Sequence, residues 1–308
     1  MWRSPEPCFD VISAISQGGR DYQEDTIITD FPLGTSSGVV VLADGMGGHA
    51  AGDVASNIVV TEVFSELKFQ SYAFSNCQDD IPASLVDAAK SANECLLGET
   101  RANPETSGMG STLVSIVIQE NHLFWISVGD SPLYILRGSR MEQLNEDHSM
   151  APQIDFMVAS GMISAEAGQD HPDRNCLTSV LMGEAVAKID CPVRPFVLER
   201  GDILLVSSDG LQFLDNNTIK KILLKHRKRK SAEIASYLMA AIRELDDPEQ
   251  DNISFSVVKV NHFESADKKD AVLHGRGANE FSHVGTTVAN LNADLAGAAL
   301  DVTAERNP

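Results

Sequence analysis

The stretch that most constrains the fold of this chain runs from Gly38 to Gly52 and reads GVVVLADGMGGHAAG. Six apolar or small residues precede Asp44, a length typical of a strand that is covered on both faces. Glycines then permit positive φ angles and a close backbone approach: Gly45, Gly47 and Gly48. A carboxylate at the end of a buried strand is costly unless it is paired or binds a cation. The stretch predicts a buried strand, a tight turn and a helix, and it raises the question of what Asp44 binds.

Three interpretations of this turn compete. Residues 45–50 satisfy the loose G-x-G-x-x-A dinucleotide fingerprint in the correct strand-to-helix context. Alternatively, Asp44 is a metal ligand, or it only caps the following helix. The dinucleotide interpretation requires an acid about 20 positions further on, at the end of a second parallel strand. Residues 60–72 instead show the pattern of a helix end, which disfavours that interpretation.

Composition limits the classes of partner. The chain has 308 residues, 43% of them hydrophobic, which is enough for one large core or two modest ones. A net charge of −20 argues against nucleic acid, because a phosphate backbone needs a basic surface. No apolar run approaches the ~20 residues of a membrane span, and the N-terminus lacks the pattern of a signal peptide. We expect a monomeric, cytoplasmic protein with no membrane partner.

The five cysteines are scattered and form no C-x-x-C pair: Cys8, Cys77, Cys95, Cys176 and Cys191. This pattern excludes a zinc ribbon and disfavours a disulfide framework. We interpret them as reduced thiols, in agreement with a cytosolic location.

Hydrophobic periodicity predicts strands over 9–16, 26–29, 38–43, 112–119, 123–128 and 133–137, with further strands within 202–211 and 251–260. Helices are predicted over 51–69, 82–97, 152–160, 217–226 and 231–245. Residues 147–183 form a long irregular insertion, a feature that is usually functional or mobile. The basic run 225–230 lies where a helix ends, which favours complementation of the helix dipole, with phosphoprotein docking as the alternative. We expect residues 263–308 to form a flexible tail, with a short helix over 291–302 as an option.

Acidic residues recur at strand ends. An acid follows an apolar strand three times and precedes one once: Asp44, Asp130, Asp209 and Asp251. Because the end of one antiparallel strand lies beside the start of its neighbour, these acids can gather at one sheet edge, joined by Glu24 and Asp25. Without neutralisation such a cluster would repel itself by several kcal/mol. Mg²⁺ or Mn²⁺ would remove that cost, since both prefer oxygen ligands.

Six motifs, in this order, resemble the metal-dependent PP2C-type (PPM) serine/threonine protein phosphatases: RDYQED (20–25), DGMGG (44–48), GST (110–112), VGDS (128–131), SDG (208–210) and DN (251–252). The segments DHS (147–149), GMI (161–163) and HPDRN (171–175) resemble the bacterial branch of that family. The resemblance covers residues 9–260. It implies an α+β fold, an αββα sandwich of two antiparallel sheets flanked by helices, with the phosphatase domain over residues 1–262.

The resemblance also implies roles at the metal centre. Asp44 would bridge two metal ions, Mn²⁺ or Mg²⁺, and act in catalysis. The Gly45 carbonyl would complete the shell of one ion. Asp209 and Asp251 would bind the first metal. Two metals would activate a water that attacks phosphorus in line, so that no phosphoenzyme forms.

Further residues would surround that centre. Glu24 and Asp25 would hold the second metal, partly through water, and Asp130 matches a position associated with a third, weaker ion. Arg20 would bind the substrate phosphate and act in catalysis, a task suited to its planar fork. Asn252 would support the ligands without touching a metal.

By this resemblance the chain hydrolyses phosphoserine and phosphothreonine in proteins that a serine/threonine kinase has modified. Some family members have a histidine where this chain has Met46, so the general acid is unassigned, with a water on the metal and His49 as the candidates. Pro132 and Phe213 also depart from the family pattern near the third-metal position. A pseudo-phosphatase that binds phosphoproteins without turnover remains the main rival, and a dehydrogenase remains a third option.

Overall fold

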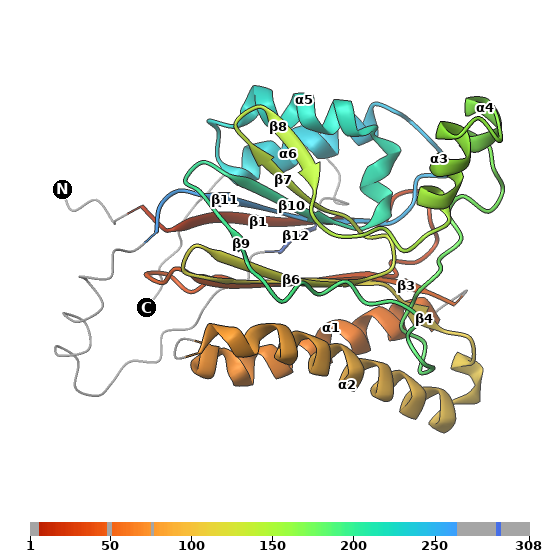
Figure 1. The fold of residues 1–308 in the computed structure, drawn as a ribbon, viewed down its shortest axis with the longest axis horizontal. Coiled ribbons are helices and arrows are strands. Elements are labelled where there is room, and N and C mark those ends of the chain that lie inside the picture. The colour runs from red at the N-terminus through yellow and green to blue at the C-terminus, as the bar shows by residue number, and fades with distance from the viewer. Residues whose placement is uncertain (1–5, 48–50, 75–76, 264–287, 291–308) are drawn as a thin grey trace, which may run out of the picture.

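Two β-sheets lie face to face at the centre of the molecule, and each is covered on its outer side by a pair of helices (Figure 1). The computed structural model describes residues 6–47, 51–74, 77–263 and 288–290. One sheet has the strand order β12-β1-β11-β10-β7-β8, and the other has the order β2-β3-β5-β6-β9 with β4 paired to β3. The predicted αββα sandwich is confirmed.

The strands of the first sheet are β1 (Phe9–Ser16), β7 (Leu133–Arg137), β8 (Arg140–Gln143), β10 (Ile203–Ser207), β11 (Ile253–Val260) and β12 (Val288–Asn290). Those of the second sheet are β2 (Asp25–Asp30), β3 (Ser37–Met46), β4 (Gly110–Ser111), β5 (Leu113–Gln119), β6 (His122–Val128) and β9 (Phe196–Val197). Strand pairing is antiparallel throughout the described residues, except between β1 and β12.

Helices α5 (Asn216–His226) and α6 (Ser231–Arg243) cover the first sheet, and α1 (Ala51–Phe74) and α2 (Ile81–Ala102) cover the second. Helices α3 (Ala151–Ala159) and α4 (Ala165–Gln169) belong to the insertion predicted over 147–183, and they lie at one end of the sandwich (Figure 1). The described residues also include three short 3₁₀ helices: η1 (Gln78–Asp80), η2 (Pro104–Thr106) and η3 (Asp209–Phe213). No helix in the described part of the chain is long and apolar enough to cross a bilayer.

Most predicted elements agree with the structure to within two or three residues. The larger differences are extensions: α1 continues to Phe74, whose side chain is buried in the core cluster of α1 and α2, and α2 continues to Ala102. Strand β3 continues to Met46, so Asp44 lies inside the strand and does not cap a helix. Antiparallel pairing of β3 with β2 and β5 also contradicts the dinucleotide interpretation, which needs a parallel sheet.

Three residues of the predicted tail, those of β12, pair in parallel with residues Ser13–Ile15 of β1. The helix predicted over 291–302 lies outside the described residues, as does His49. The domain boundary at residue 262 therefore stays a prediction.

Strand β3 shows how an uninterrupted apolar run serves two cores. Val39, Val41 and Ala43 belong to the cluster shared with α1 and α2. Val40 and Leu42 point the other way, into the cluster between the two sheets. Successive side chains of a strand alternate between its faces, so a strand covered on both faces must be apolar at every position. This packing confirms the prediction made for residues 38–43.

Leu42→Ala is expected to lower the free energy of unfolding by about 2–5 kcal/mol, because Leu42 is completely buried between the sheets and its truncation leaves a cavity. Leu33→Ala is the matched control: Leu33 is 87% exposed, and its loss should change stability by less than ~0.5 kcal/mol. Urea unfolding followed by circular dichroism measures both. Equal losses in the two variants would contradict the packing described for β3.

Candidate active site

A cavity of about 690 Å³ opens between the sheet ends and residues 175–182. Its wall includes every predicted site residue except one: Arg20, Glu24, Asp44, Gly45, Asp130, Asp209, Asp251 and Asn252. The exception is Asp25, which is buried beside Asp44. The fold thus brings together residues from five separate stretches of the sequence.

Strand pairing explains how the acids converge. Asp25 at the start of β2 is the register partner of Asp44 near the end of β3. Asp209 follows β10 and Asp251 precedes β11, and these two strands are antiparallel neighbours. Asp130 lies in the turn after β6. The end of one strand meets the start of the next, as the sequence predicts.

Close backbone contacts account for two glycines of the site. A Cβ atom on Gly45 would lie 2.0 Å from the Gly52 carbonyl oxygen, and one on Gly210 would lie 1.9 Å from the Asn252 carbonyl oxygen. Of the three glycines expected to permit a positive φ or a close backbone approach, Gly47 has a positive φ (149°), Gly45 does not, and Gly48 lies outside the described residues. Gly45 is therefore required by crowding, with its N–H donating to the Glu24 carbonyl (3.1 Å).

Asn252 ties the loop after β1 to the start of β11. Its Nδ2 donates to the carbonyl oxygens of Gln17 (2.8 Å) and Tyr22 (2.9 Å), and its Oδ1 accepts from the Glu24 backbone N–H (2.7 Å). The side chain is 4% exposed and thus uses both ends of its amide inside the protein. It holds the loop that carries Arg20 and Glu24 against the metal-ligand candidates.

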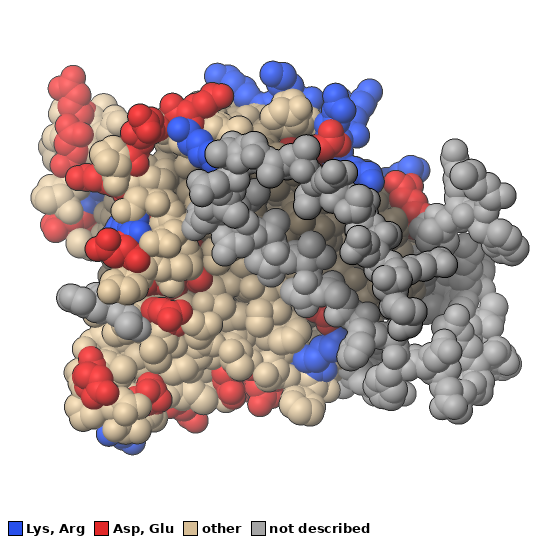
Figure 2. Space-filling view, turned by 180° about the vertical axis from the view of Figure 1, so that it is seen from behind, with Lys and Arg blue, Asp and Glu red and all other residues tan. Residues whose placement is uncertain are grey.

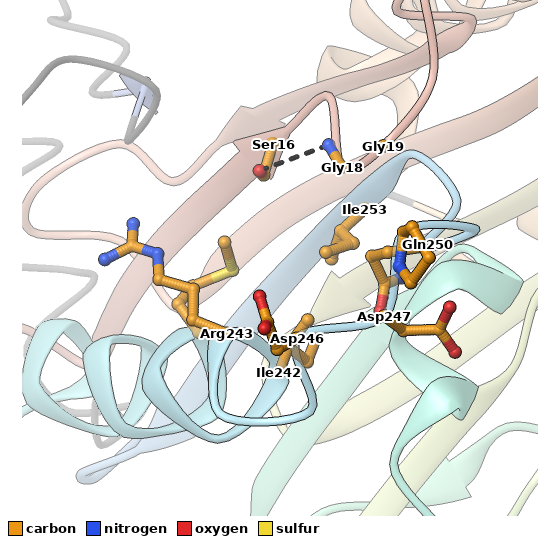
Figure 3. Close-up of a pocket in the computed structure, with 11 residues that line it drawn as sticks. Ser16, Gly18, Gly19, Ile242, Arg243, Asp246, Asp247, Gln250 and Ile253 are labelled. Atoms are coloured by element: carbon orange, nitrogen blue, oxygen red, sulfur yellow. Dashed lines mark hydrogen bonds between the residues drawn. The ribbon is translucent and has the colours of Figure 1, made fainter.

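Arg20 and Asp251 pair with each other, with 2.6 Å between Nη2 and Oδ2. Behind this pair, the Gly19 N–H donates to the Gln250 carbonyl (2.7 Å). A second cavity, of about 640 Å³, is lined by Gly18, Gly19 and Gln250 among other residues (Figure 3). Neighbouring residues of the Arg20 loop, and of the segment that precedes β11, therefore line both cavities.

Several carboxylate oxygens of the site are buried without a hydrogen-bond partner among the described residues. They are Glu24 Oε1, Asp25 Oδ1 and Asp209 Oδ1. The other oxygen of Asp25 accepts from Ser208 Oγ (2.7 Å). Since buried polar atoms normally have partners, these atoms mark a place where a positive group is missing from the protein alone.

The electrostatics of the cluster agree with that conclusion. Burial raises the pKa of Asp25 and of Asp130 to about 7 in each case, and the Asp209 carboxylate adds to both shifts. Burial, with the charges of neighbouring carboxylates, raises the pKa of Asp44 well above its ordinary value. The pKa values of Glu24 and Asp209 are raised by the same causes. Protonation or cation binding is needed to relieve this cluster.

The carboxylates do not form a finished coordination shell. Among the described residues, no three Asp, Glu, His or Cys side chains are arranged to hold one ion as they stand. The donor set still fits a hard divalent cation, because the unpartnered atoms of the acidic cluster are carboxylate oxygens and none of the described residues that line the cavity is a histidine.

Two hydroxyl groups support the acids. Thr112 Oγ1 accepts from the Asp44 backbone N–H (3.0 Å), and the Thr112 N–H donates to the Asp44 carbonyl (2.8 Å). Ser208 holds Asp25, as noted. Both hydroxyl groups are engaged in hydrogen bonds within the protein, since Thr112 Oγ1 also contacts Ser131 Oγ (2.9 Å). Met46 lines the cavity at the position of the missing histidine.

Part of the wall comes from residues that sequence reasoning did not single out as site residues: Asn175, Cys176, Leu177, Val180 and Met182. The signals for them were the length of the 147–183 insertion and, for Asn175 alone, its place in the HPDRN segment (171–175). His148 joins this insertion to the Asp130 turn, because its Nδ1 accepts from the Gly129 N–H (3.3 Å) and its carbonyl accepts from the Thr178 N–H (2.7 Å).

Comparison with known proteins agrees with this site. A family model described as protein phosphatase 2C matches residues 30–247. The serine/threonine phosphatase Stp of Listeria monocytogenes is 32% identical over 203 residues, which are 66% of this chain and 78% of that protein.

Solved structures agree as well. The serine/threonine phosphatase of S. agalactiae superimposes with a TM-score of 0.69 at 26% identity, covering 82% of this chain and 100% of the other. The catalytic domain of the phosphatase PstP, solved with two manganese ions, gives a TM-score of 0.64 at 26% identity, covering 82% and 99%. The chain therefore belongs to the bacterial branch of the protein phosphatase 2C family of serine/threonine protein phosphatases, enzymes that act on phosphorylated proteins.

Proposed function

We propose that this chain hydrolyses phosphoserine and phosphothreonine esters in proteins, with two divalent cations, Mn²⁺ or Mg²⁺, held by its carboxylate cluster. The observation that carries this proposal is the group of acids with raised pKa values and unpartnered oxygens around one cavity. A relative solved with two manganese ions supports it. When bound, such ions neutralise phosphate charge and supply a water that is nucleophilic near neutral pH.

In this proposal the Asp44 carboxylate would contribute to holding both ions, and the Gly45 carbonyl would contribute to one of them. Asp209 and Asp251 hold one ion, while Glu24 and Asp25 hold the other. The arrangement of the acids supports this assignment. Besides burial, the charges of four other aspartates raise the pKa of Asp44, so it lies centrally among them: Asp25, Asp209, Asp130 and Asp251. Asp130 is the candidate for a third ion, and Asn252 supports the loop without touching a metal.

Arg20 is the phosphate-binding group in this proposal. Its side chain is 54% exposed and lines the cavity, so the guanidinium can turn from Asp251 to a substrate phosphate. Its planar fork offers two parallel N–H groups, which match two phosphate oxygens. The 147–183 insertion, whose residues 175–182 form part of the wall, would control access.

The phosphoprotein substrates would be products of a serine/threonine kinase, and the chain would act as a monomer. The five cysteines are free, which supports the reducing cytoplasm expected from the sequence.

Asp209→Asn is expected to lower kcat for p-nitrophenyl phosphate by at least roughly 100-fold, because loss of a ligand charge weakens the metal centre. EDTA should abolish wild-type turnover, and added Mn²⁺ should restore it. Asp251→Asn should raise the Mn²⁺ concentration needed for half-maximal rate. Asp87→Asn, at an exposed position of α2, is the control and should match wild type. No turnover by the wild type with either metal would favour the pseudo-phosphatase.

Arg20→Lys is expected to raise KM for a phosphopeptide by about tenfold with a smaller change in kcat, because lysine keeps the charge but loses the bidentate fork. Steady-state kinetics with a phosphothreonine peptide measure this. An unchanged KM would remove Arg20 from the phosphate site.

The metal-free protein is expected to lose stability as pH rises from about 4 to about 7. Asp25 ionises near 3.8 when unfolded but near 7 when folded, so the folded state binds the extra proton in that window. Asp25→Asn in EDTA should therefore become more stable than wild type across that range, by a few kcal/mol at pH 8. Saturating Mn²⁺ should reverse the order, because the wild type binds the ion more tightly.

Thermal unfolding at several pH values, with EDTA or Mn²⁺, measures both effects. Asp87→Asn again serves as the control, and its curves should follow the wild type. A gap between Asp25→Asn and wild type that does not vary with pH would contradict the raised pKa of Asp25.

A further inference from the structure

Seven of the 24 basic residues of this acidic chain lie within eleven positions. We call this group the basic patch, defined as Lys220, Lys221, Lys225, Arg227, Lys228, Arg229 and Lys230. No acidic residue occurs between Asp215 and Glu233. Figure 2 shows basic side chains gathered along the edge of the molecule where α5 and α6 lie. Such a concentration, in a chain with net charge −20, requires a physical explanation.

Complementation of the helix dipole explains only part of the patch. Lys225 lies in the last turn of α5, where a cation is favourable. Lys228, Arg229 and Lys230, however, directly precede Ser231, the first residue of α6, where the dipole favours anions. The anion that serves this end of α6 is Asp10, whose carboxylate accepts from the Ser231 N–H and Oγ, both at 2.8 Å. The dipole interpretation of the run 225–230 is therefore incomplete.

The patch is also poorly neutralised by the protein itself. Arg229 pairs with Glu233 at 3.3 Å, and Arg227 donates to the Gly138 carbonyl (3.2 Å). Within the described ranges, no carboxylate forms an ion pair with Lys221, Lys225 or Lys228. All three side chains are exposed. Like charges held together without counter-charges repel each other, so an anionic partner would be stabilising.

The patch is connected to the active site by one helix. Asp209, in the cavity wall, begins η3, and α5 follows at Asn216. The patch occupies α5 from Lys220 onward and the turn after it. Eleven helical residues extend ~16 Å, so the far end of α5 is at least about that far from its N-terminus. A substrate whose phosphate occupies the cavity would therefore need an extended linker to reach the far end of the patch.

We propose that the basic patch docks an acidic segment of the phosphoprotein substrate, separated from the phosphorylated residue by an extended linker. This docking role rests on the phosphatase activity proposed above. A short acidic segment fits the charge distribution better than a broad anionic surface does. The rest of the chain carries a net −27, since the patch holds seven positive charges of a chain whose total is −20. A flat membrane or a long nucleic acid would also meet those acids.

The test compares phosphothreonine peptides that carry a run of glutamates or a matched run of glutamines. The run follows the phosphothreonine after a Gly/Ser spacer of about two residues (~7 Å) or about eight residues (~28 Å at full extension). For the wild type at low salt, the glutamate peptide with the long spacer should show a KM about five- to tenfold below its glutamine counterpart. The short spacer should give no such advantage.

The variant Lys221→Gln/Lys225→Gln/Lys228→Gln should lose the advantage while its rate with p-nitrophenyl phosphate stays at the wild-type value. A matched control, Lys90→Gln/Arg101→Gln/Arg194→Gln, removes three exposed charges elsewhere and should keep the advantage. High salt, about 0.5 M, should abolish it in all proteins, because exposed charges are screened. Fluorescence anisotropy of an unphosphorylated glutamate peptide reads the docking directly, without turnover.

These measurements separate the two proposals. Peptide binding that depends on Lys221, Lys225 and Lys228 without any turnover would preserve the docking surface and overturn the phosphatase. Turnover with equal KM values for the glutamate and glutamine peptides would overturn the docking surface. The docking surface would also be overturned if the peptides showed no preference while the wild type bound anionic phosphatidylglycerol vesicles or single-stranded DNA more tightly than the triple variant.

Discussion

The crowding of buried carboxylates at one end of the sandwich is the constraint on which the rest of this structure depends. Asp25, Asp44 and Asp209 share a partly dehydrated space, and their pKa values rise as a result. Burial of like charges opposes folding unless protons or cations compensate it. The surrounding strands pack into two apolar core clusters. This packing supplies the stability that keeps the acids together in spite of their repulsion. The active site is thus stabilised by parts of the molecule that take no part in the chemistry.

The sequence predicts the regular part of the fold well, because the physical signal is local. The apolar run of β3 is readable since every residue in it is buried, and the acids at strand ends converge because antiparallel strands alternate in direction. The resemblance to a phosphatase family adds the roles of Arg20 and the acids. Its outline of the fold is confirmed, while the role of each residue remains to be tested.

Other features could not be predicted, because they depend on contacts across long sequence separations. Nothing in the local pattern around Ser208 indicates that its hydroxyl bonds to Asp25, or that Arg20 pairs with Asp251. The small and apolar residues of the 175–182 segment carry no motif, and only packing places them in the cavity wall. The close backbone approach expected at Gly45 is present, but that the Gly52 carbonyl makes it, and leaves no room for a side chain, depends on contacts that the local pattern does not contain.

The contacts of Asn252 have a consequence for the order in which the enzyme becomes functional. Asn252 binds Glu24 across 228 residues, and β11, the strand it precedes, pairs along its whole length with β1. A chain emerging from the ribosome carries Arg20 and Asp44 early, yet it lacks the partners that position them until residues near 260 have been made. Domains fold as units during synthesis, and contacts of long sequence separation form last. The N-terminal and C-terminal parts of the domain must pair before the site is complete. An unfinished chain therefore has no assembled active site with which to remove phosphates from the proteins around it.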